Sequence, residues 1–147
     1  MSAADLAVDE PIRVLVCDDD ELFAQALVET LTGDVRLEVV GVARHGREAL
    51  ELARAPGAVD VVLLDIEMPQ MDGIETLRSL QGWPQRPAVM MLTGITDSEV
   101  IKRAEAEGPD AFLRKSVDPE EVINGILIIR ELVRAAAPRD GLAGAVA

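Results

Sequence analysis

The sequence predicts an α/β fold in which a five-stranded parallel sheet has helices on both faces. Five short apolar runs alternate with five segments of helical periodicity, which is typical of repeated strand–helix–strand units. The runs at 12–17, 59–64 and 88–92 are apolar almost throughout, as strands buried on both faces are. A chain of 147 residues, 49 % of them apolar, is long enough for one domain with a proper core.

The first half of the chain contains three of the predicted strands. The run IRVLVC predicts a strand at Ile12–Cys17, and apolar residues at helical spacing predict a helix at 22–31. The run LEVVGVA predicts a second strand at Leu37–Ala43, and a short helix follows at 48–54. The run VDVVLL predicts a third, fully buried strand at 59–64.

The second half repeats this alternation. Helical spacing predicts a helix at 74–80, and AVMML predicts a fourth strand at 88–92. A charged, exposed helix is expected at 98–107, and AFLR predicts a short fifth strand at Ala111–Arg114. The last helix is predicted at Pro119–Ala136, where apolar residues recur over several turns.

We expect a single domain over residues 11–137. Residues 1–10 are interpreted as a polar N-terminal lead and residues 138–147 as a tail or the start of a linker. No apolar run approaches the length of a membrane span, and the N-terminus has no signal-peptide character. The single Cys17 cannot form an internal disulfide, which fits a reducing compartment, so the cytoplasm is the expected location.

The charge of the chain argues against two classes of partner. Fourteen basic and 27 acidic residues give a formal net charge of −13. Such a surface repels nucleic-acid phosphates and anionic lipids, and the absence of tyrosine leaves few rings for base stacking. We therefore expect no nucleic-acid or membrane binding through this chain itself.

Polar side chains follow four of the predicted strands. In open α/β sheets, ligands bind beyond the carboxyl ends of the strands, so residues at these ends are the candidates for a functional site. The candidates are Asp18, Asp19 and Asp20 after the first strand, Asp65 after the third, Thr93 and Gly94 after the fourth, and Lys115 after the fifth.

These residue types suit phosphoryl transfer. Asp65 is a carboxylate nucleophile that can accept a phosphoryl group as an acyl phosphate. Asp18 and Asp19 supply the oxygen ligands that Mg²⁺ prefers. Lys115 adds a mobile positive charge, and the Thr93 hydroxyl can donate to a phosphoryl oxygen. Because phosphoryl transfer depends mainly on positioning and charge neutralisation, this set is sufficient.

Over roughly residues 12–136, the chain resembles the receiver domain of two-component response regulators. The matching pieces are the acidic pair after IRVLVC, DIEMPQMDG at Asp65, MLTG at Thr93 and FLRK at Lys115, in the family's order and at its approximate spacing. Each piece alone is a weak signal, but the four together are specific. The segment KSVDPEEV also resembles receivers of the LuxR-type DNA-binding subclass.

The resemblance implies a flavodoxin-like sheet of order 2-1-3-4-5 and a set of roles. Asp65 would be the phosphoacceptor and Asp19 the direct Mg²⁺ ligand, with Asp18 acting through water and the backbone carbonyl of Glu67 completing the metal site. Thr93 and Lys115 would bind the phosphate, and Gly94 is small enough to leave it open.

The family also implies residues that control the switch. Thr93 and Phe112 would be the switch pair, and Glu67 and Ile95 would flank the path of the attacking water. Because Ile95 is apolar and cannot orient a water, we expect slow dephosphorylation. Many receivers have proline after the lysine, whereas this chain has Ser116; a cis bond before a residue other than proline is costly, but whether the Lys115–Ser116 peptide is cis or trans stays open at this point.

The implied partner is a sensor histidine kinase, and the chain would be a phosphoacceptor rather than a turnover enzyme. The apolar arc of the last helix is wider than docking on a sheet requires, which favours self-association through Ile128 and Leu132. Whether the receiver is a single-domain regulator or part of a longer transcriptional regulator stays open.

Two other functions compete with this interpretation. VLVCDDDE can be read as the motif of haloacid dehalogenase-like phosphatases, with Asp18 as nucleophile and Asp20 as acid/base, but that reading leaves Asp65 unexplained. A receiver that is never phosphorylated and acts only by binding is the second alternative. The simplest reading of the three aspartates, acids at the start of a helix, is outweighed by the other motifs.

Overall fold

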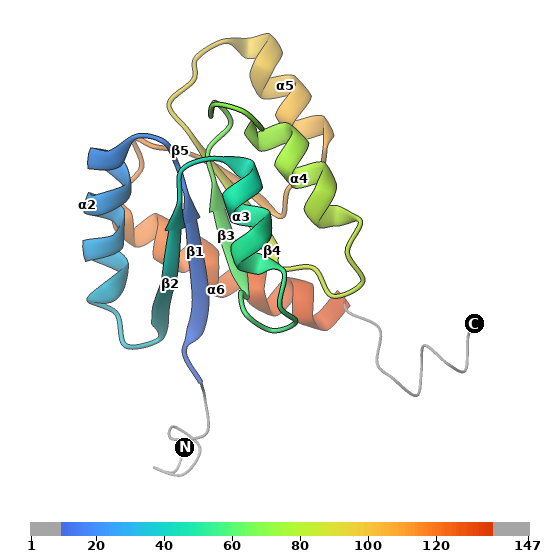
Figure 1. Ribbon diagram of the computed structural model, residues 1–147. Coiled ribbons are helices and arrows are strands. Elements are labelled where there is room, and N and C mark those ends of the chain that lie inside the picture. Colours follow the sequence, from blue (N-terminus) through green and yellow to red (C-terminus); the bar gives the residue numbers. More distant parts are fainter. Residues whose placement is uncertain (1–9, 137–147) are drawn as a thin grey trace.

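The computed structural model describes residues 10–136, and the interpretations of residues 1–9 and 137–147 lie outside this range. All strands are parallel, in the order β2-β1-β3-β4-β5 (Figure 1). This confirms the predicted α/β class and strand order. The strands are β1 (Ile12–Cys17), β2 (Leu37–Ala43), β3 (Val61–Leu64), β4 (Ala88–Thr93) and β5 (Ala111–Arg114).

A helix follows every strand. None of the helices between residues 10 and 136 has the length and apolarity needed to cross a membrane. The helices are α2 (Glu21–Thr32), α3 (Gly46–Ala53), α4 (Gly73–Gln81), α5 (Ser98–Ala106) and α6 (Pro119–Ala136).

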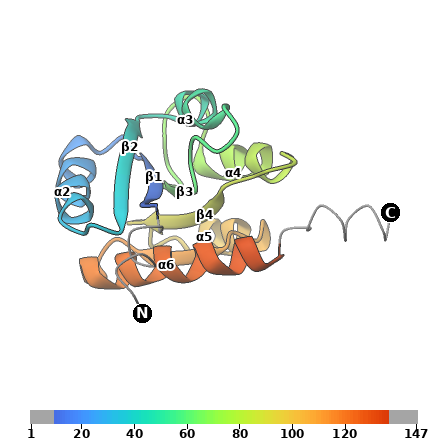
Figure 2. The same ribbon diagram turned by 90° about the horizontal axis from the view of Figure 1, so that it is seen from below.

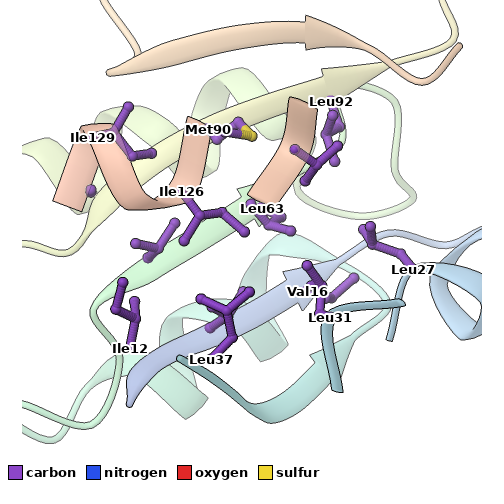
Figure 3. Close-up of a cluster of buried hydrophobic side chains, with 14 of the residues drawn as sticks. Ile12, Val16, Leu27, Leu31, Leu37, Leu63, Met90, Leu92, Ile126 and Ile129 are labelled. Atoms are coloured by element: carbon purple, nitrogen blue, oxygen red, sulfur yellow. The ribbon is translucent and has the colours of Figure 1, made fainter. Parts of the chain in front are cut away.

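The sheet separates two hydrophobic cores. One core lies between the sheet and the helices α2 and α6. In Figure 3, Ile126 of α6 lies beside Leu63 of β3, and Leu27 of α2 lies beside Val16 of β1. The other core joins the opposite face to α3, α4 and α5. The view from below places α6 and α3 on opposite sides of the sheet (Figure 2). The central strands are therefore buried on both faces, which explains why their sequences are apolar throughout.

Three helices begin one or two residues earlier than predicted. The side chains of Asp20, His45 and Asp72 accept the N–H groups of residues three positions further on, so each helix starts directly after its cap. His45, expected to be a turn residue, thus caps α3 through Nδ1, which lies 3.2 Å from the Glu48 nitrogen.

The third strand is shorter than the predicted 59–64, because its ladder begins at Val61. The Asp60 carboxylate accepts the Arg13 N–H at 2.8 Å, in place of a backbone acceptor. The same carboxylate lies 3.4 Å from the Arg13 Nε. An aspartate that uses its side chain in this way starts a strand rather than continuing one.

Candidate functional site

Three carboxylates meet at the carboxyl end of the sheet. Cys17 and Leu64 are register partners on β1 and β3, so the residues that follow them emerge side by side. Asp18, Asp19 and Asp65 each offer a carboxylate oxygen within 4.8 Å of the others. Such a cluster is electrostatically unfavourable unless a cation offsets it. The structure therefore brings together the three acids that the sequence predicted.

The three consecutive aspartates have different surroundings. Asp18 is 4 % exposed, and its Oδ1 accepts the Asp20 N–H at 2.9 Å, whereas Asp19 is exposed. The Asp20 side chain instead caps α2 by accepting the Phe23 N–H at 3.1 Å. The reading of these aspartates as helix-start acids thus holds for Asp20, while Asp18 and Asp19 belong to the cluster.

Lys115 brings the positive charge to this cluster. It directly follows β5, and its Nζ lies 2.7 Å from Asp18 Oδ2 and 3.5 Å from Asp65 Oδ2. Burial works against the ammonium charge, but the hydrogen bond to Asp18 and the charge of Asp65 outweigh it and raise the pKa of Lys115. No cis peptide occurs between residues 10 and 136, so the Lys115–Ser116 bond is trans.

In the absence of a bound cation, the surroundings of Asp65 favour its neutral form more than water does. Burial first, and then the negative charge of Asp18, raise the pKa of Asp65 to about 7, although Lys115 and the Ile66 N–H act in the opposite direction. A bound cation would reverse this balance. Burial likewise raises the pKa of Cys17 to about 12, so this thiol is not a competing nucleophile.

The segment after β3 turns away sharply from the site. Gln70 has a φ of 67°. Gly73 then lies against the backbone of Asp65. A Cβ at this position would be 2.1 Å from the Asp65 carbonyl oxygen. The Gly73 N–H donates to the Ile66 carbonyl at 2.8 Å, and Asp72 caps α4. DIEMPQMDG therefore places the Asp65 carboxylate at the carboxyl end of the sheet and starts α4 at Gly73.

Thr93 is the last residue of β4, and Gly94 follows it, next to Lys115. Thr93 is fully buried, and its Oγ1 accepts the Ile95 N–H at 3.0 Å. A Cβ on Gly94 would come no closer than 3.8 Å to the Lys115 side chain, so this position stays open. Phe112 is half-buried and packs on the core beneath α4 and α5.

The acids open into a cleft of about 980 Å³ between the β3–α4 and β4–α5 loops. Glu67 and Ile95 line this cleft together with Asp65, as their proposed roles require. The cleft also contains Arg103 of α5, which the sequence did not single out. A second basic residue, Arg114, reaches over the rim and donates to the Ile95 carbonyl at 3.0 Å. Arg114 belongs to the FLRK piece, but the sequence analysis assigned a role only to the lysine of that piece, and Arg103 stands in no motif.

The comparisons with known proteins agree on one family. A profile described as the response regulator receiver domain matches residues 14–127. The chain belongs to the response regulator receiver family. NarL of Mycobacterium tuberculosis, named a probable transcriptional regulatory protein, is 32% identical over 139 residues, which are 93% of this chain and 64% of that protein. The solved receiver domain of NarL has a TM-score of 0.77 and 31% identity, covering 83% of this chain and 98% of that chain.

A second group of relatives has a different output. A protein-glutamate methylesterase/protein-glutamine glutaminase of a Nocardioides species is 32% identical over 137 residues, which are 89% of this chain but 37% of that protein. The chain spans between about a quarter and two thirds of the length of the curated relatives it matches. Membership in the receiver family assigns this domain to phosphoacceptor switches rather than to haloacid dehalogenase-like phosphatases.

Proposed function

We propose that this chain is a phosphorylation-controlled switch in which Asp65 accepts a phosphoryl group from a sensor histidine kinase in the cytoplasm. The observation that carries the proposal is the position of Asp65 at the end of a buried strand, with Asp18 and Asp19 within 4.8 Å and the Lys115 Nζ 3.5 Å away. A nucleophile, a cation-binding pair and a phosphate-binding cation thus lie around one point.

The donor set fits Mg²⁺, which prefers carboxylate and carbonyl oxygens and keeps several waters. Asp19, Asp65 and the backbone carbonyl of Glu67 would bind it directly, and Asp18 through water. When bound, Mg²⁺ neutralises the charge that accumulates between the carboxylates and the phosphoryl oxygens. The exposed position of Asp19 suits a direct ligand, because its carboxylate forms no ion pair with any residue from 10 to 136.

In the transfer step, an Asp65 oxygen attacks the phosphorus of a phosphohistidine. The oxygen–phosphorus bond forms, the phosphorus–nitrogen bond breaks, and the imidazole leaves with the electron pair and takes up a proton. Lys115 and the Thr93 hydroxyl bind the phosphoryl oxygens, and Gly94 leaves room for them. The Thr93 Oγ1 accepts the Ile95 N–H, which leaves its hydroxyl proton available for a phosphoryl oxygen. Movement of Thr93 and Phe112 together would then shift a pre-existing equilibrium of the β4–β5 region.

The chain would promote its own phosphorylation and dephosphorylation without turning over a separate substrate. Relatives named as methylesterases are matched over 27–37% of their length, so an enzymatic output elsewhere in a longer protein is compatible with this proposal. Relatives named as transcriptional regulators make a DNA-binding output equally compatible. With a net charge of −13, the chain itself would not supply that contact.

The proposed readout surface is α6. Val122, Ile126 and Ile129 are buried against the sheet, whereas Ile128 and Leu132 are 58 % and 61 % exposed. We expect a second copy of the chain to cover these two side chains when Asp65 is phosphorylated.

The decisive experiment is intact-protein mass spectrometry after treatment with a small acyl phosphate. We expect the mass to rise by one phosphoryl group when Mg²⁺ is present and not when it is chelated. Asp65→Asn should abolish the uptake. Equal uptake by Asp65→Asn would place the phosphoacceptor elsewhere, and no uptake by the parent protein would favour a receiver that acts only by binding.

A further inference from the structure

Lys115 is held by an aromatic ring as well as by two carboxylates. Its Nζ lies 4.4 Å from the centroid of the Phe23 ring, a distance typical of a cation–π contact. Phe23 belongs to the first turn of α2, and its N–H is the group that the Asp20 cap binds. The cap that starts this helix therefore also fixes the place of the ring beside the site.

The Phe23 ring contacts both the hydrophobic core and a charged group of the site. Phe23 is half-buried and packs against the core beneath α2 and α6, so part of the ring is anchored there. The ring also faces Lys115, whose side chain is only 17% exposed. An ammonium group that has lost much of its water needs other partners, and the negative face of an aromatic ring is one. A leucine at position 23 would fill the same space, but it has no aromatic face with which to attract a cation.

We propose that Phe23 is a positioning residue that keeps the Lys115 ammonium over the phosphoacceptor. This inference rests on the proposed function, because it concerns the same site. In the structure, Asp18 and Asp65 share the hold on Lys115. Once these carboxylates serve a cation and a phosphoryl group, their hold on Lys115 weakens, whereas the ring stays in place. Phe23 thus keeps the ammonium ready for the incoming phosphoryl oxygens.

The test replaces Phe23 by mono-, di- and trifluorophenylalanine. Fluorine withdraws charge from the ring face and hardly changes its shape, so a role in packing alone predicts no trend. We expect the second-order rate constant for phosphorylation by acetyl phosphate to fall stepwise with each fluorine, by roughly 2- to 10-fold in total. Phe23→Leu should lower it to a similar extent, and Phe23→Tyr should largely retain it.

A Lys115→Met background provides the matched control. If the ring acts through Lys115, fluorination of Phe23 has no further effect on the rate in that background. An equal fluorine trend with and without Lys115 would overturn the inference. The midpoint of urea unfolding is recorded for each variant, so that only folded protein enters the comparison.

A readout without metal or phosphoryl donor is also available. The chain has two lysines, Lys102 and Lys115, so their side-chain NMR signals are readily distinguished. We expect the Hε protons of Lys115 to lie upfield of those of Lys102, because they sit over the Phe23 ring, and to lose this shift in Phe23→Leu. Coincident Hε shifts in the parent protein would show that the contact does not form in solution.

The outcomes separate this inference from the proposed function. A parent protein that takes up no phosphoryl group overturns both. A parent protein that is phosphorylated at Asp65, at a rate that stays flat across the fluorine series, overturns the role of Phe23 alone.

Discussion

At the scale of single residues, the two acids of the metal pair differ in what they are already bound to. The Asp18 carboxylate holds Lys115 at 2.7 Å and accepts the Asp20 N–H, whereas Asp19 is exposed at the mouth of the cleft. Asp18 and Asp19 look equivalent in the sequence, but their surroundings suit them to different roles. Asp18 organises the cluster, and Asp19 is free to bind a cation directly.

This difference predicts the ranking of two variants. Asp19→Ala should weaken Mg²⁺ binding by more than the roughly 10- to 100-fold that loss of an outer-shell partner costs. Asp18→Ala should cost less, because it removes a water-mediated contact and frees Lys115 to pair with Asp65. Isothermal titration with Mg²⁺ measures both. The reverse ranking would exchange the roles of the two aspartates.

We propose that Ile95 controls the lifetime of the phosphorylated state. This side chain lines the cleft beside Asp65 and has no group with which to orient an attacking water. Replacing it by glutamate should speed hydrolysis of phospho-Asp65, by about 10-fold if the carboxylate acts as a positioned base. The decay of the phosphorylated mass after removal of the donor gives the half-life. An unchanged half-life in Ile95→Glu would remove the lifetime role of this position.

Sequence reasoning found the residues at strand ends but not their neighbours from other elements. Asp65, Thr93 and Lys115 follow apolar runs, so topology alone brings them to one edge. Phe23 and Arg114 could not be found in this way. Their contacts depend on how α2 is rotated over the sheet and on which way a side chain leaves β5. Neither property is encoded in a motif.

At the scale of elements, helix α3 packs closely against the β3–α4 loop that follows Asp65. The Gly46 N–H donates to the Met71 carbonyl at 3.1 Å, in the loop that begins after Asp65. A Cβ on Gly46 would lie 1.9 Å from Thr76 Oγ1 and 2.8 Å from the Met71 carbonyl oxygen. The helices α3 and α4 can thus approach this closely only because residue 46 has no side chain.

Gly46→Ala should therefore lower the free energy of unfolding by about 1–3 kcal/mol, the usual cost of overpacking a tight contact. Gly82→Ala is the matched control, since the nearest atom to its added Cβ is the Ser79 carbonyl oxygen at 3.6 Å. We expect that change to stay within about 0.5 kcal/mol. Urea unfolding of both variants provides the comparison, and equal losses would mean that α3 can shift at no cost.

Element boundaries show what periodicity can and cannot determine. The bounds of β1, β2, β5 and α6 agree with the prediction, because apolar runs and a proline start define them. The start of β3 was wrong, since Asp60 is flanked by valines, yet its carboxylate takes the Arg13 N–H that a backbone carbonyl would accept in a continuing ladder. Helix starts were late because a cap such as His45 is not apolar and falls outside the periodic pattern.

At the scale of the whole molecule, the order of the strands came from the family resemblance and not from periodicity. Alternation predicts five parallel strands, but many orders satisfy it. The order matters for function, because pairing of β1 with β3 places Asp18 beside Asp65. The same order puts α6 and α2 on one face of the sheet, which leaves the outer side of α6 as a free surface.

The exposed side of α6 leads to the last prediction, which is that the chain self-associates when it is phosphorylated. Ile128 and Leu132 are exposed on α6, next to the ion pair that Glu131 forms with Arg130 at 3.1 Å. Two chains of net charge −13 repel one another, so apolar contact must outweigh this repulsion, and added salt should favour the dimer by screening it.

Light scattering with Mg²⁺ and beryllofluoride, a phosphoryl mimic, should show the mass of a dimer, and without the mimic that of a monomer. Leu132→Glu should restore the monomer, because it places a further negative charge at the centre of the contact. Leu52→Glu is the control, since Leu52 is also exposed but lies on α3, across the sheet. Loss of the dimer in both variants would point to added charge as the cause, whereas a dimer that survives Leu132→Glu would place the interface on another face.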